Sequence, residues 1–382
     1  MDPTRFTAAR TGKLIEIHTP VNDWAFIPEP LSPSLGADEE LDGLLVEAMT
    51  ELGRLDGAGI HFSNPELLLR PLRRREALKS SSLEGTHATA EQLVQFELPG
   101  LRKVGPEGAV KEVINYARAL DHGAQLLEAL PYCLRLIKEI HERLLRGVRG
   151  KDKRPGIFRE TQVHIGSDRR FVPTPPEELE SVLDQFEKAL HGRPKSIHPL
   201  IWCYLVHYQF ETIHPFNDGN GRVGRLLLAL MVSRDCDLNQ PWLYMSPWFE
   251  KHSKEYIDLL FEISATGAWE PWIKFCLRGT IEQAKDALQR LKSIIELKQD
   301  YLTRVSASDG VARLVKLVDE LFAQAPAITI PHAQGILEVS YPTARSDVNR
   351  LIELGIVEKT ETGHPKLFVA WDILRIGSAE SD

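Results

Sequence analysis

The chain has 382 residues, enough for two or three domains. Its 43% apolar residues, 26% charged residues and net charge of −8 are ordinary values for a globular protein. The longest apolar runs, 200–206 and 226–232, fall far short of the ~20 residues of a membrane-spanning helix, which argues against a membrane protein.

The cysteines and the first residues indicate a compartment. Cys133, Cys203, Cys236 and Cys276 lie far apart among apolar neighbours. No Cys-x2-Cys pair or His/Cys cluster suggests zinc or disulfides. The first residues also lack the apolar run of a signal peptide. We therefore expect a cytoplasmic protein with no membrane partner.

The first part of the chain differs from the rest. Residues 1–40 show little periodicity, and the proline-rich stretch 22–33 predicts an extended arm that packs on another part of the protein. Helical spacing then dominates, with an apolar stripe over 41–55. Further helices are predicted over 110–129 and 131–146, each with one apolar face for the core.

Residues 67–86 contain the short pattern Ser80-x3-Glu84-Gly85. Taken alone, this segment predicts a helix that ends at Gly85 and carries a surface glutamate.

The helical pattern breaks over 150–176. Two short β-favouring runs flank Gly166-Ser167-Asp168 and predict a hairpin over 163–172. Taken alone, it is a surface hairpin without a function.

The most informative stretch runs from His214 to Arg225 and reads His-Pro-Phe-Asn-Asp-Gly-Asn-Gly-Arg-Val-Gly-Arg. Its centre, Gly219-Asn220-Gly221, permits positive φ angles, so successive backbone N–H groups can surround an anion. The helix-forming run 226–232 follows at once. This order predicts an anion cradle at a helix N-terminus, where free N–H groups and the helix dipole favour phosphate.

The charged side chains of this stretch suit a phosphate-handling site. Arg222 and Arg225 lie on one helical face, and guanidinium groups match phosphate oxygens. Asp218 is a hard oxygen ligand for Mg²⁺, and His214 can accept a hydroxyl proton near neutral pH. A tight turn with Asp218 as N-cap is the structural alternative. Two arginines at a helix N-terminus oppose the dipole, however, and indicate an anion as their partner.

The stretch resembles the Fic-family signature, His-x-Phe-x-(Asp/Glu)-Gly-Asn-Gly-Arg-x-x-Arg, and matches it at every fixed position. The resemblance implies transfer of a nucleotide, most often AMP from ATP, to a hydroxyl of a target protein. By this analogy His214 deprotonates the hydroxyl and Asp218 holds Mg²⁺. The nest at 219–221 and Arg222 would bind the α and β phosphates, and Arg225 the γ phosphate.

The resemblance assigns two larger sets of residues. Those assigned to the nucleotide are Gly219, Asn220, Gly221, Arg222, Val223, Gly224, Arg225 and Tyr256. The hairpin resembles the flap on which Fic proteins add a segment of the target by β-augmentation. The residues assigned to this flap are Val163, His164, Ile165, Gly166, Phe171 and Val172.

Ser80, Glu84 and Gly85 resemble the inhibitory-helix motif of the family, (Ser/Thr)-x3-Glu-(Gly/Asn). A carboxylate that reaches the cradle would pair with Arg225 and take the place of the γ phosphate. ATP would then bind with its α phosphate misaligned for attack. Because the motif precedes the core, the chain resembles the class whose inhibitory helix is N-terminal.

Residues 241–260 resemble the segment on the adenine side, where Tyr256 suits stacking on the base. Many relatives have a second tyrosine next to it and an asparagine near position 252. This chain has Ile257 and His252 instead, and core packing is the alternative for its aromatic residues. His207 is interpreted as a packing or hydrogen-bonding residue, not a metal ligand.

Residues 277–305 predict one long helix, and 306–310 break it at a domain boundary. Three helices and two strands around a Gly-Pro turn follow, and they resemble a winged helix. Residues 309–382 carry seven Lys and Arg against eleven Asp and Glu, a net charge of −4. Since duplex DNA is bound through neutralised phosphates, we do not expect DNA as a partner and favour protein interaction or packing.

We therefore expect a mainly α protein, with a Fic helical core, a short β-hairpin flap and a C-terminal winged-helix domain. The expected divisions are an N-terminal region with the inhibitory helix (1–105), the catalytic core (106–275), a linking helix (276–308) and the winged-helix domain (309–382). The expected function is autoinhibited, Mg²⁺-dependent transfer of AMP from ATP to a Ser, Thr or Tyr hydroxyl of a target protein or of the chain itself. Pyrophosphate is released, and removal of AMP is the reverse activity. A nucleotide-sensing DNA-binding regulator is the alternative, and a homodimer is left open.

Overall fold

Two buried helices lie at the centre of the fold. The computed structural model describes residues 1–7, 11–18, 20–60, 66–97, 108–166, 169–360 and 366–378. Helix α7 (Pro199–Ile213) is buried from its second residue onward, and α8 (Asn220–Asp235) is buried over most of its length. A helix that is buried on all sides belongs in the interior. The loop between α7 and α8 is therefore placed inside the molecule.

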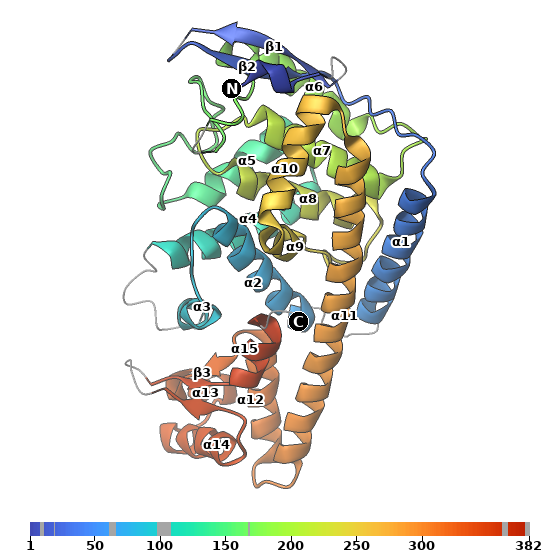
Figure 1. Cartoon of the computed structure of the whole chain (residues 1–382). Coiled ribbons are helices and arrows are strands. Elements are labelled where there is room, and N and C mark those ends of the chain that lie inside the picture. Colours follow the sequence, from blue (N-terminus) through green and yellow to red (C-terminus); the bar gives the residue numbers. More distant parts are fainter. Residues whose placement is uncertain are drawn as a thin grey trace.

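The other helices of the core pack around this pair (Figure 1). They are α4 (Ala109–Leu127), α5 (Leu134–Leu145), α6 (Pro176–His191), α9 (Ser246–Lys251) and α10 (Ser253–Thr266). The helices predicted over 110–129 and 131–146 are confirmed as α4 and α5. The mainly α fold class is confirmed as well.

The first forty residues contain a small sheet where an extended arm was predicted. Strands β1 (Gly12–Ile17) and β2 (Asp23–Pro28) pair antiparallel over their full length. The sheet is tied to the flap, because Phe26 N donates to the Val172 carbonyl at 2.9 Å. The prediction was wrong because the prolines that suggested an arm stand at the end of β2 and beyond it, where a strand tolerates them.

The N-terminal region also contains three helices. A short 3-10 turn, η1 (Pro3–Arg5), precedes the sheet, and α1 (Glu39–Ile60), α2 (Glu66–Leu83) and α3 (Ala90–Glu97) follow it. Helix α2 is the helix predicted over 67–86. It ends at Leu83, so Glu84 and Gly85 form the turn that follows.

The predicted long helix is confirmed as α11 (Trp269–Ser306), which has 38 residues. It begins earlier than its predicted start and runs along much of the molecule (Figure 1). Helix α1 packs along it. Neither α11 nor any other helix among the described residues is both long and apolar enough to cross a membrane.

The described C-terminal residues, from Val311 onward, form four helices and a three-stranded antiparallel sheet of order β3-β5-β4. Their elements are α12 (Val311–Ala323), β3 (Ala327–Ile328), α13 (Ile330–Leu337), α14 (Tyr341–Glu353), β4 (Glu358–Lys359), β5 (Phe368–Val369) and α15 (Trp371–Ser378). The three helices and the two strands around the turn were predicted. The strand β3 was not predicted, because its two residues carry no periodicity, and the eight-residue helix α15 was not predicted either. Assignment to the winged-helix class stays a prediction.

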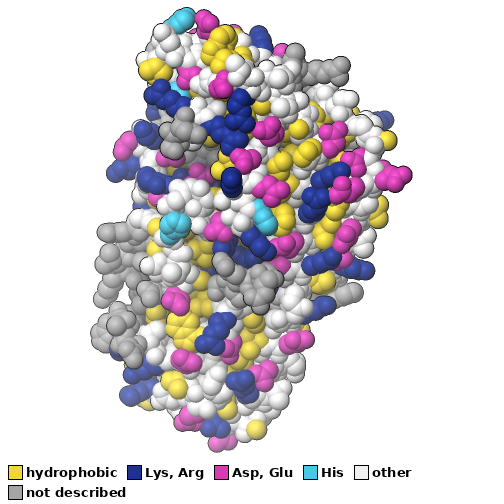
Figure 2. Space-filling model, viewed as in Figure 1, with side chains coloured by type: hydrophobic (Ala, Val, Ile, Leu, Met, Phe, Trp, Pro, Cys, Tyr) yellow, Lys and Arg dark blue, Asp and Glu magenta, His cyan; other side chains and the backbone are white. Residues whose placement is uncertain are grey.

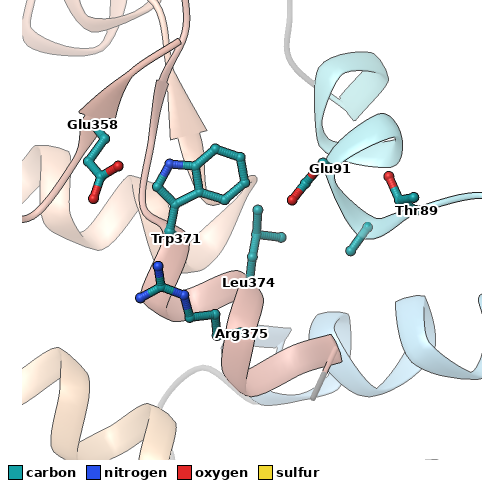
Figure 3. A pocket seen from close by; sticks show the side chains of 7 residues that line it. Thr89, Glu91, Glu358, Trp371, Leu374 and Arg375 are labelled. Carbon is teal, nitrogen blue, oxygen red and sulfur yellow. The ribbon is translucent and has the colours of Figure 1, made fainter. Parts of the chain in front are cut away.

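This C-terminal domain contacts the helices on both sides of Glu84. Helix α15 packs on α2 and α3, and α12 packs on α2. Val94 of α3 lies in a buried apolar cluster with Val369 and Leu374. A hollow of about 530 Å³ remains beside this contact, with Trp371 and Leu374 facing the start of α3 (Figure 3).

Candidate active site

A cavity of about 570 Å³ opens where α7 ends and α8 begins. Its walls come from the end of α2, the flap, the segment from the end of α7 through the start of α8, and α10. The predicted residues that line it are Glu84, Ile165, Gly166, Phe171, His214, Asp218, Gly219, Asn220, Gly221, Arg225 and Tyr256. The remaining predicted residues, Ser80, Gly85, Val163, His164, Val172, Arg222, Val223 and Gly224, belong to the same four segments and are not part of the lining.

His214 follows α7 directly and has a left-handed backbone, with φ 51° and ψ 62°. Its Nδ1 lies 3.2 Å from the Glu211 carbonyl oxygen. A carbonyl can only accept, so Nδ1 carries the proton and Nε2 keeps its lone pair. Desolvation in the cavity wall lowers the pKa of His214 to about 4. The ring is therefore neutral at pH 7 and can accept a proton.

Arg159 was not predicted as a site residue, yet it holds the backbone around His214. Its Nε donates to the His214 carbonyl at 2.8 Å, and its Nη2 to that of Ile213 at 3.3 Å. Its backbone N donates to the Pro215 carbonyl at 2.9 Å. Carbonyls at a helix end need such partners. Because these partners are backbone groups far along the chain, no local motif marks Arg159.

The α7–α8 loop is held by its own side chains. Asn220 Oδ1 accepts from Phe216 N, and Asn220 Nδ2 donates to Phe216 O, both at 2.8 Å. Asn220 was assigned to the nucleotide, but its amide group closes the loop. The Phe216 ring stacks on His141 with centroids 3.7 Å apart. His141 Nδ1 accepts from Gly156 N at 2.8 Å, so its Nε2 donates to the Asp218 carbonyl at 2.9 Å. His141 is a second supporting residue that sequence reasoning missed.

The three glycines of the signature serve two purposes. Gly219 has a φ of 81°, as the predicted cradle requires. Gly221 does not use the positive φ that it permits, since α8 begins at Asn220. At Gly221 a Cβ would lie 2.2 Å from Glu84 Oε1, and at Gly224 it would lie equally close to the Glu211 carboxyl. These two glycines provide space, whereas Gly219 provides the turn.

Arg225 connects α8 with the end of α2. Its Nε donates to Ser80 Oγ and its Nη2 to the Ser80 carbonyl, both at 2.9 Å. Its Nη2 also lies 2.8 Å from Glu84 Oε1. Burial of the Glu84 carboxyl opposes ionisation, but Arg225 outweighs burial and holds the pKa of Glu84 below its usual range. The structure thus brings the predicted inhibitory residues onto the arginine assigned to the γ phosphate.

Arg222 is fully buried one turn earlier on α8. Its Nη1 donates to Glu112 Oε2 at 2.9 Å, and its Nη2 lies 3.8 Å from Asp218 Oδ1. Glu112 belongs to α4, and sequence reasoning did not find it. Val223, the residue after Arg222 on α8, is also fully buried and is a core residue.

Asp218 is the candidate metal ligand. Its side chain is 32% exposed and lies beside the N-terminus of α8. Phosphate-bound Mg²⁺ commonly takes one or two carboxylates and completes its shell with water and phosphate oxygens. A single carboxylate open to an anion cradle fits such an ion. Among the described residues, no group of three or more His, Cys, Asp and Glu side chains could hold a metal without a ligand's help.

Tyr256 lies in the cavity wall, with one face of its ring packed on Phe249 at a centroid distance of 4.4 Å. Its hydroxyl is 2.9 Å from His207 Nε2. Burial lowers the pKa of His207 to about 3, so that ring is a neutral hydrogen-bonding partner. His252 packs on Trp248 and is not part of the cavity lining.

The buried end of the cavity holds one group that sequence reasoning missed. Glu211 lines it, and its Oε1 has no hydrogen-bond partner within the described ranges. Desolvation raises the pKa of this carboxyl to about 8. Ile257, Leu260 and Ser264 of α10 line the adjacent wall.

The flap covers the other side of the cavity. Ile165 and Phe171 form an antiparallel bridge, with Ile165 N donating to Phe171 O at 2.9 Å. The predicted hairpin is therefore present as a single bridge, and its tip at 167–168 lies outside the described residues. Phe171 packs with Phe26 and Phe261 in one apolar cluster. This packing fixes the C-terminal arm of the flap against β2 and α10.

The fold and this site define a family. Residues 131–232 match the model of the Fic/DOC family, and residues 43–125 match the model of the Fic/DOC family N-terminal region. Over these residues the chain belongs to the Fic/DOC family.

Particular proteins resemble the chain over part of their length. The protein adenylyltransferase Fic of Drosophila virilis is 38% identical over 198 residues, which are 50% of this chain and 38% of that protein. Its namesake in Drosophila grimshawi is 38% identical over 125 residues, 32% of this chain and 25% of that protein. The chain thus spans well under half of these curated relatives. A Fic family protein from Desulfovibrio desulfuricans shares the fold, with a TM-score of 0.58, 20% identity, and coverage of 92% of this chain and 100% of that one.

Proposed function

We propose that this chain is a protein adenylyltransferase that transfers AMP from ATP to a hydroxyl group of a target protein. The observation that carries the proposal is the position of His214. Its Nε2 lone pair lies in the same cavity as the N-terminus of α8 and Arg225. A base, an anion cradle and a cation in one cavity suit in-line attack on a phosphate.

The transfer step follows from these positions. The target hydroxyl oxygen attacks the α phosphorus of ATP while its proton passes to His214 Nε2. The bond between the α phosphorus and the bridging oxygen to the β phosphate breaks. Pyrophosphate leaves with that electron pair. Free N–H groups at the start of α8, together with Arg222 and Arg225, stabilise the charge on the phosphates.

Asp218 would hold Mg²⁺, which supplies further neutralisation of phosphate charge when it is bound. His141 keeps the Asp218 carbonyl in place at 2.9 Å, so the carboxylate starts from a fixed backbone. The same contact aligns the loop that presents His214.

We infer that Glu84 inhibits the transfer. Its carboxylate pairs with Arg225 and occupies the space above Gly221, which are the charge and the room that the γ phosphate would use. When ATP binds while Glu84 is in place, its γ phosphate cannot contact Arg225. Its α phosphate is then not aligned for in-line attack by the target hydroxyl. When AMP is already on a target, Glu84 can instead orient a water for its removal.

The flap would hold the target. A backbone segment that pairs with the strand around Ile165 brings a Ser, Thr or Tyr hydroxyl over the cavity with little demand on sequence. Phe171, packed against α10, keeps this edge at a constant distance from His214.

The test uses ATP labelled at the α or the γ phosphate, with wild type, Glu84→Gly and His214→Ala. We expect incorporation of α label into protein, raised in Glu84→Gly and abolished in His214→Ala. His122→Ala, on α4 and outside the cavity lining, serves as the matched histidine control and should retain activity. Incorporation of γ label would refute adenylyl transfer. Equal activity of wild type and Glu84→Gly would refute inhibition by Glu84.

A further inference from the structure

We propose that Glu112 is a positioning residue for Arg222, which it orients so that the free edge of the guanidinium faces the phosphates of the nucleotide. The inference rests on the proposed function and adds a residue to the same site. Glu112 belongs to α4, stands outside the signature and lies 110 residues before Arg222 in the chain.

Burial makes this pair necessary. The Arg222 side chain has no exposed surface, and that of Glu112 is 5% exposed. Their hydrogen bond, from Nη1 to Oε2, is 2.9 Å long. A buried guanidinium without a carboxylate is strongly destabilised by desolvation. Glu112 therefore supplies the counter-charge that allows Arg222 to occupy its place beneath the cradle.

The rest of the Arg222 guanidinium points to a ligand. Its Nε and Nη2 have no hydrogen-bond partner among the described residues. These two nitrogens form one planar edge, the kind that binds two oxygens of a phosphate at once. Nη2 lies 3.8 Å from Asp218 Oδ1, so this buried edge lies next to the candidate metal ligand, directly behind the cavity lining. Buried donors without partners are rare in native proteins, and here they mark a place for an anion.

Glu112 is itself held rigidly. It lies in the first turn of α4, where a negative charge is favoured by the helix dipole. One turn later, Asn115 Nδ2 donates to the carbonyls of Leu144 at 3.1 Å and Arg146 at 3.0 Å. These bonds join the start of α4 to the end of α5. The orientation of Arg222 is thus set by the packing of two helices outside the signature.

The same carboxylate also contacts the turn that carries Glu84. Thr86 Oγ1 donates to Glu112 Oε2 at 2.9 Å. Arg149 Nη2 donates to the Glu84 carbonyl at 3.2 Å and to Thr86 Oγ1 at 3.1 Å. Withdrawal of Glu84 breaks bonds of this turn, yet Glu112 keeps its bond to Arg222. Positioning of Arg222 therefore persists when inhibition is relieved.

The experiment is a double-mutant cycle in the Glu84→Gly background, with the affinity for ATP and Mg²⁺ measured by calorimetry. Glu112→Gln should weaken ATP binding about tenfold, the scale of a lost charge-assisted contact. In an Arg222→Ala protein the same substitution should cause no further loss, because Glu112 acts through Arg222. Asp347→Asn is the matched control, since Asp347 is a buried partner of Arg313 in the C-terminal domain. It should leave ATP affinity unchanged.

Thermal melting of each variant separates positioning from loss of structure. An unchanged ATP affinity in Glu112→Gln, or losses that add in the double variant, would overturn the proposal. If Glu112→Gln does not fold, Glu112→Asp keeps the charge, withdraws it by one methylene and should still weaken ATP binding. If the cycle shows coupling but no variant transfers α label, the proposed function fails while the assignment of Glu112 stands.

Discussion

The Arg225 guanidinium donates hydrogen bonds to three oxygens at the end of α2, two of Ser80 and one of Glu84. Two of these contacts come from a residue that does not take part in the proposed chemistry. Ser80 is fully buried, and its two contacts with the guanidinium do not involve Glu84. At the scale of single residues, the proposed inhibition therefore needs only the Glu84 carboxylate to move, while Ser80 can keep Arg225 in place.

Ser80→Ala should destabilise the protein by ~1–2 kcal/mol, because it removes the acceptor for Arg225 Nε and leaves a buried donor unpaired. Urea unfolding of wild type and variant measures the loss. Ser82→Ala, on the same helix but only partly buried, is the control and should cost less. Equal losses of stability in the two variants would show that the hydrogen bond from Arg225 to Ser80 adds no stability of its own.

The stability of the protein should depend on pH through Glu211. Its folded pKa of about 8 lies above the ordinary value of 4.5, so the folded state binds this proton more tightly. The resulting stabilisation is complete below pH 4.5 and is lost as pH rises toward 8, by at most about 1.4 kcal/mol per pH unit. Glu211→Gln should remove this contribution to the pH dependence of the free energy of unfolding, measured from pH 5 to 8. Glu128→Gln, on the exposed end of α4, should leave the slope as in wild type.

At the scale of elements, α2 is fastened by a buried carboxylate. Glu76 accepts from Tyr116 Oη of α4 at 2.7 Å and from Ser246 N of α9 at 3.0 Å. Burial raises the pKa of Glu76, which makes its donors essential to the ionised form. The position of Glu84, in the turn after α2, is therefore determined partly by the contacts of Glu76 within that helix.

Tyr116→Phe should loosen α2 and raise basal incorporation of α label several-fold, at a cost of ~1–2 kcal/mol in stability. The removed hydroxyl leaves Glu76 with fewer donors and lets Glu84 depart from Arg225 more often. Tyr132→Phe removes a buried hydroxyl that donates to Asp235, away from α2, and is the matched control. A rise in both variants, or in neither, would count against control through α2.

The sequence predicts the signature, the inhibitory residues and most helices, because each has a local pattern. Periodicity identifies α4 and α11, and fixed spacing identifies His214 to Arg225. The residues that it does not reveal act across the chain. Arg159 and His141 bond to backbone carbonyls, and Glu112 meets Arg222 only after α4 and α8 pack. No spacing rule encodes contacts of this kind.

The errors have similar causes. The N-terminal sheet was missed because prolines near β2 resemble those of an extended arm. The sequence also does not say where α8 begins, so it reveals neither the loop contact of the Asn220 amide nor the space that Gly221 leaves for Glu84. Once α8 starts at Asn220, its amide is free to close the loop, and Gly221 is needed for space.

At the scale of the whole molecule, the C-terminal domain packs on the segment that we propose to be inhibitory. Arg70 of α2 donates to the Gln324 carbonyl at 2.9 Å, and α3 shares an apolar cluster with α15. On this domain, Lys and Arg side chains are interspersed with Asp and Glu (Figure 2). Arg350 pairs with Glu353 at 2.8 Å, on the third helix of the domain. That DNA is not a partner stays a prediction, and the contacts with α2 and α3 favour a domain that supports these helices.

Leu374→Ala should raise basal incorporation of α label, because it weakens the contact between α15 and α3 that flanks Glu84. The cavity should cost about 2–4 kcal/mol. Leu351→Ala is the matched control, since Leu351 is buried on α14 within the domain. It should destabilise the domain without activating the enzyme. Activation by both variants would mean that general loosening, not this contact, releases Glu84.

The cavity keeps a volume of about 570 Å³ while Glu84 is bound to Arg225. The proposed inhibition would therefore leave room for ATP, and it would divide bound ATP between a reactive and an unreactive pose. That division is an intramolecular equilibrium, so saturation with ATP does not change it. Restraint by Glu84 should therefore lower kcat and leave KM nearly unchanged. On this proposal, we expect activation by a partner or a change that moves α2, and not by a rise in nucleotide concentration.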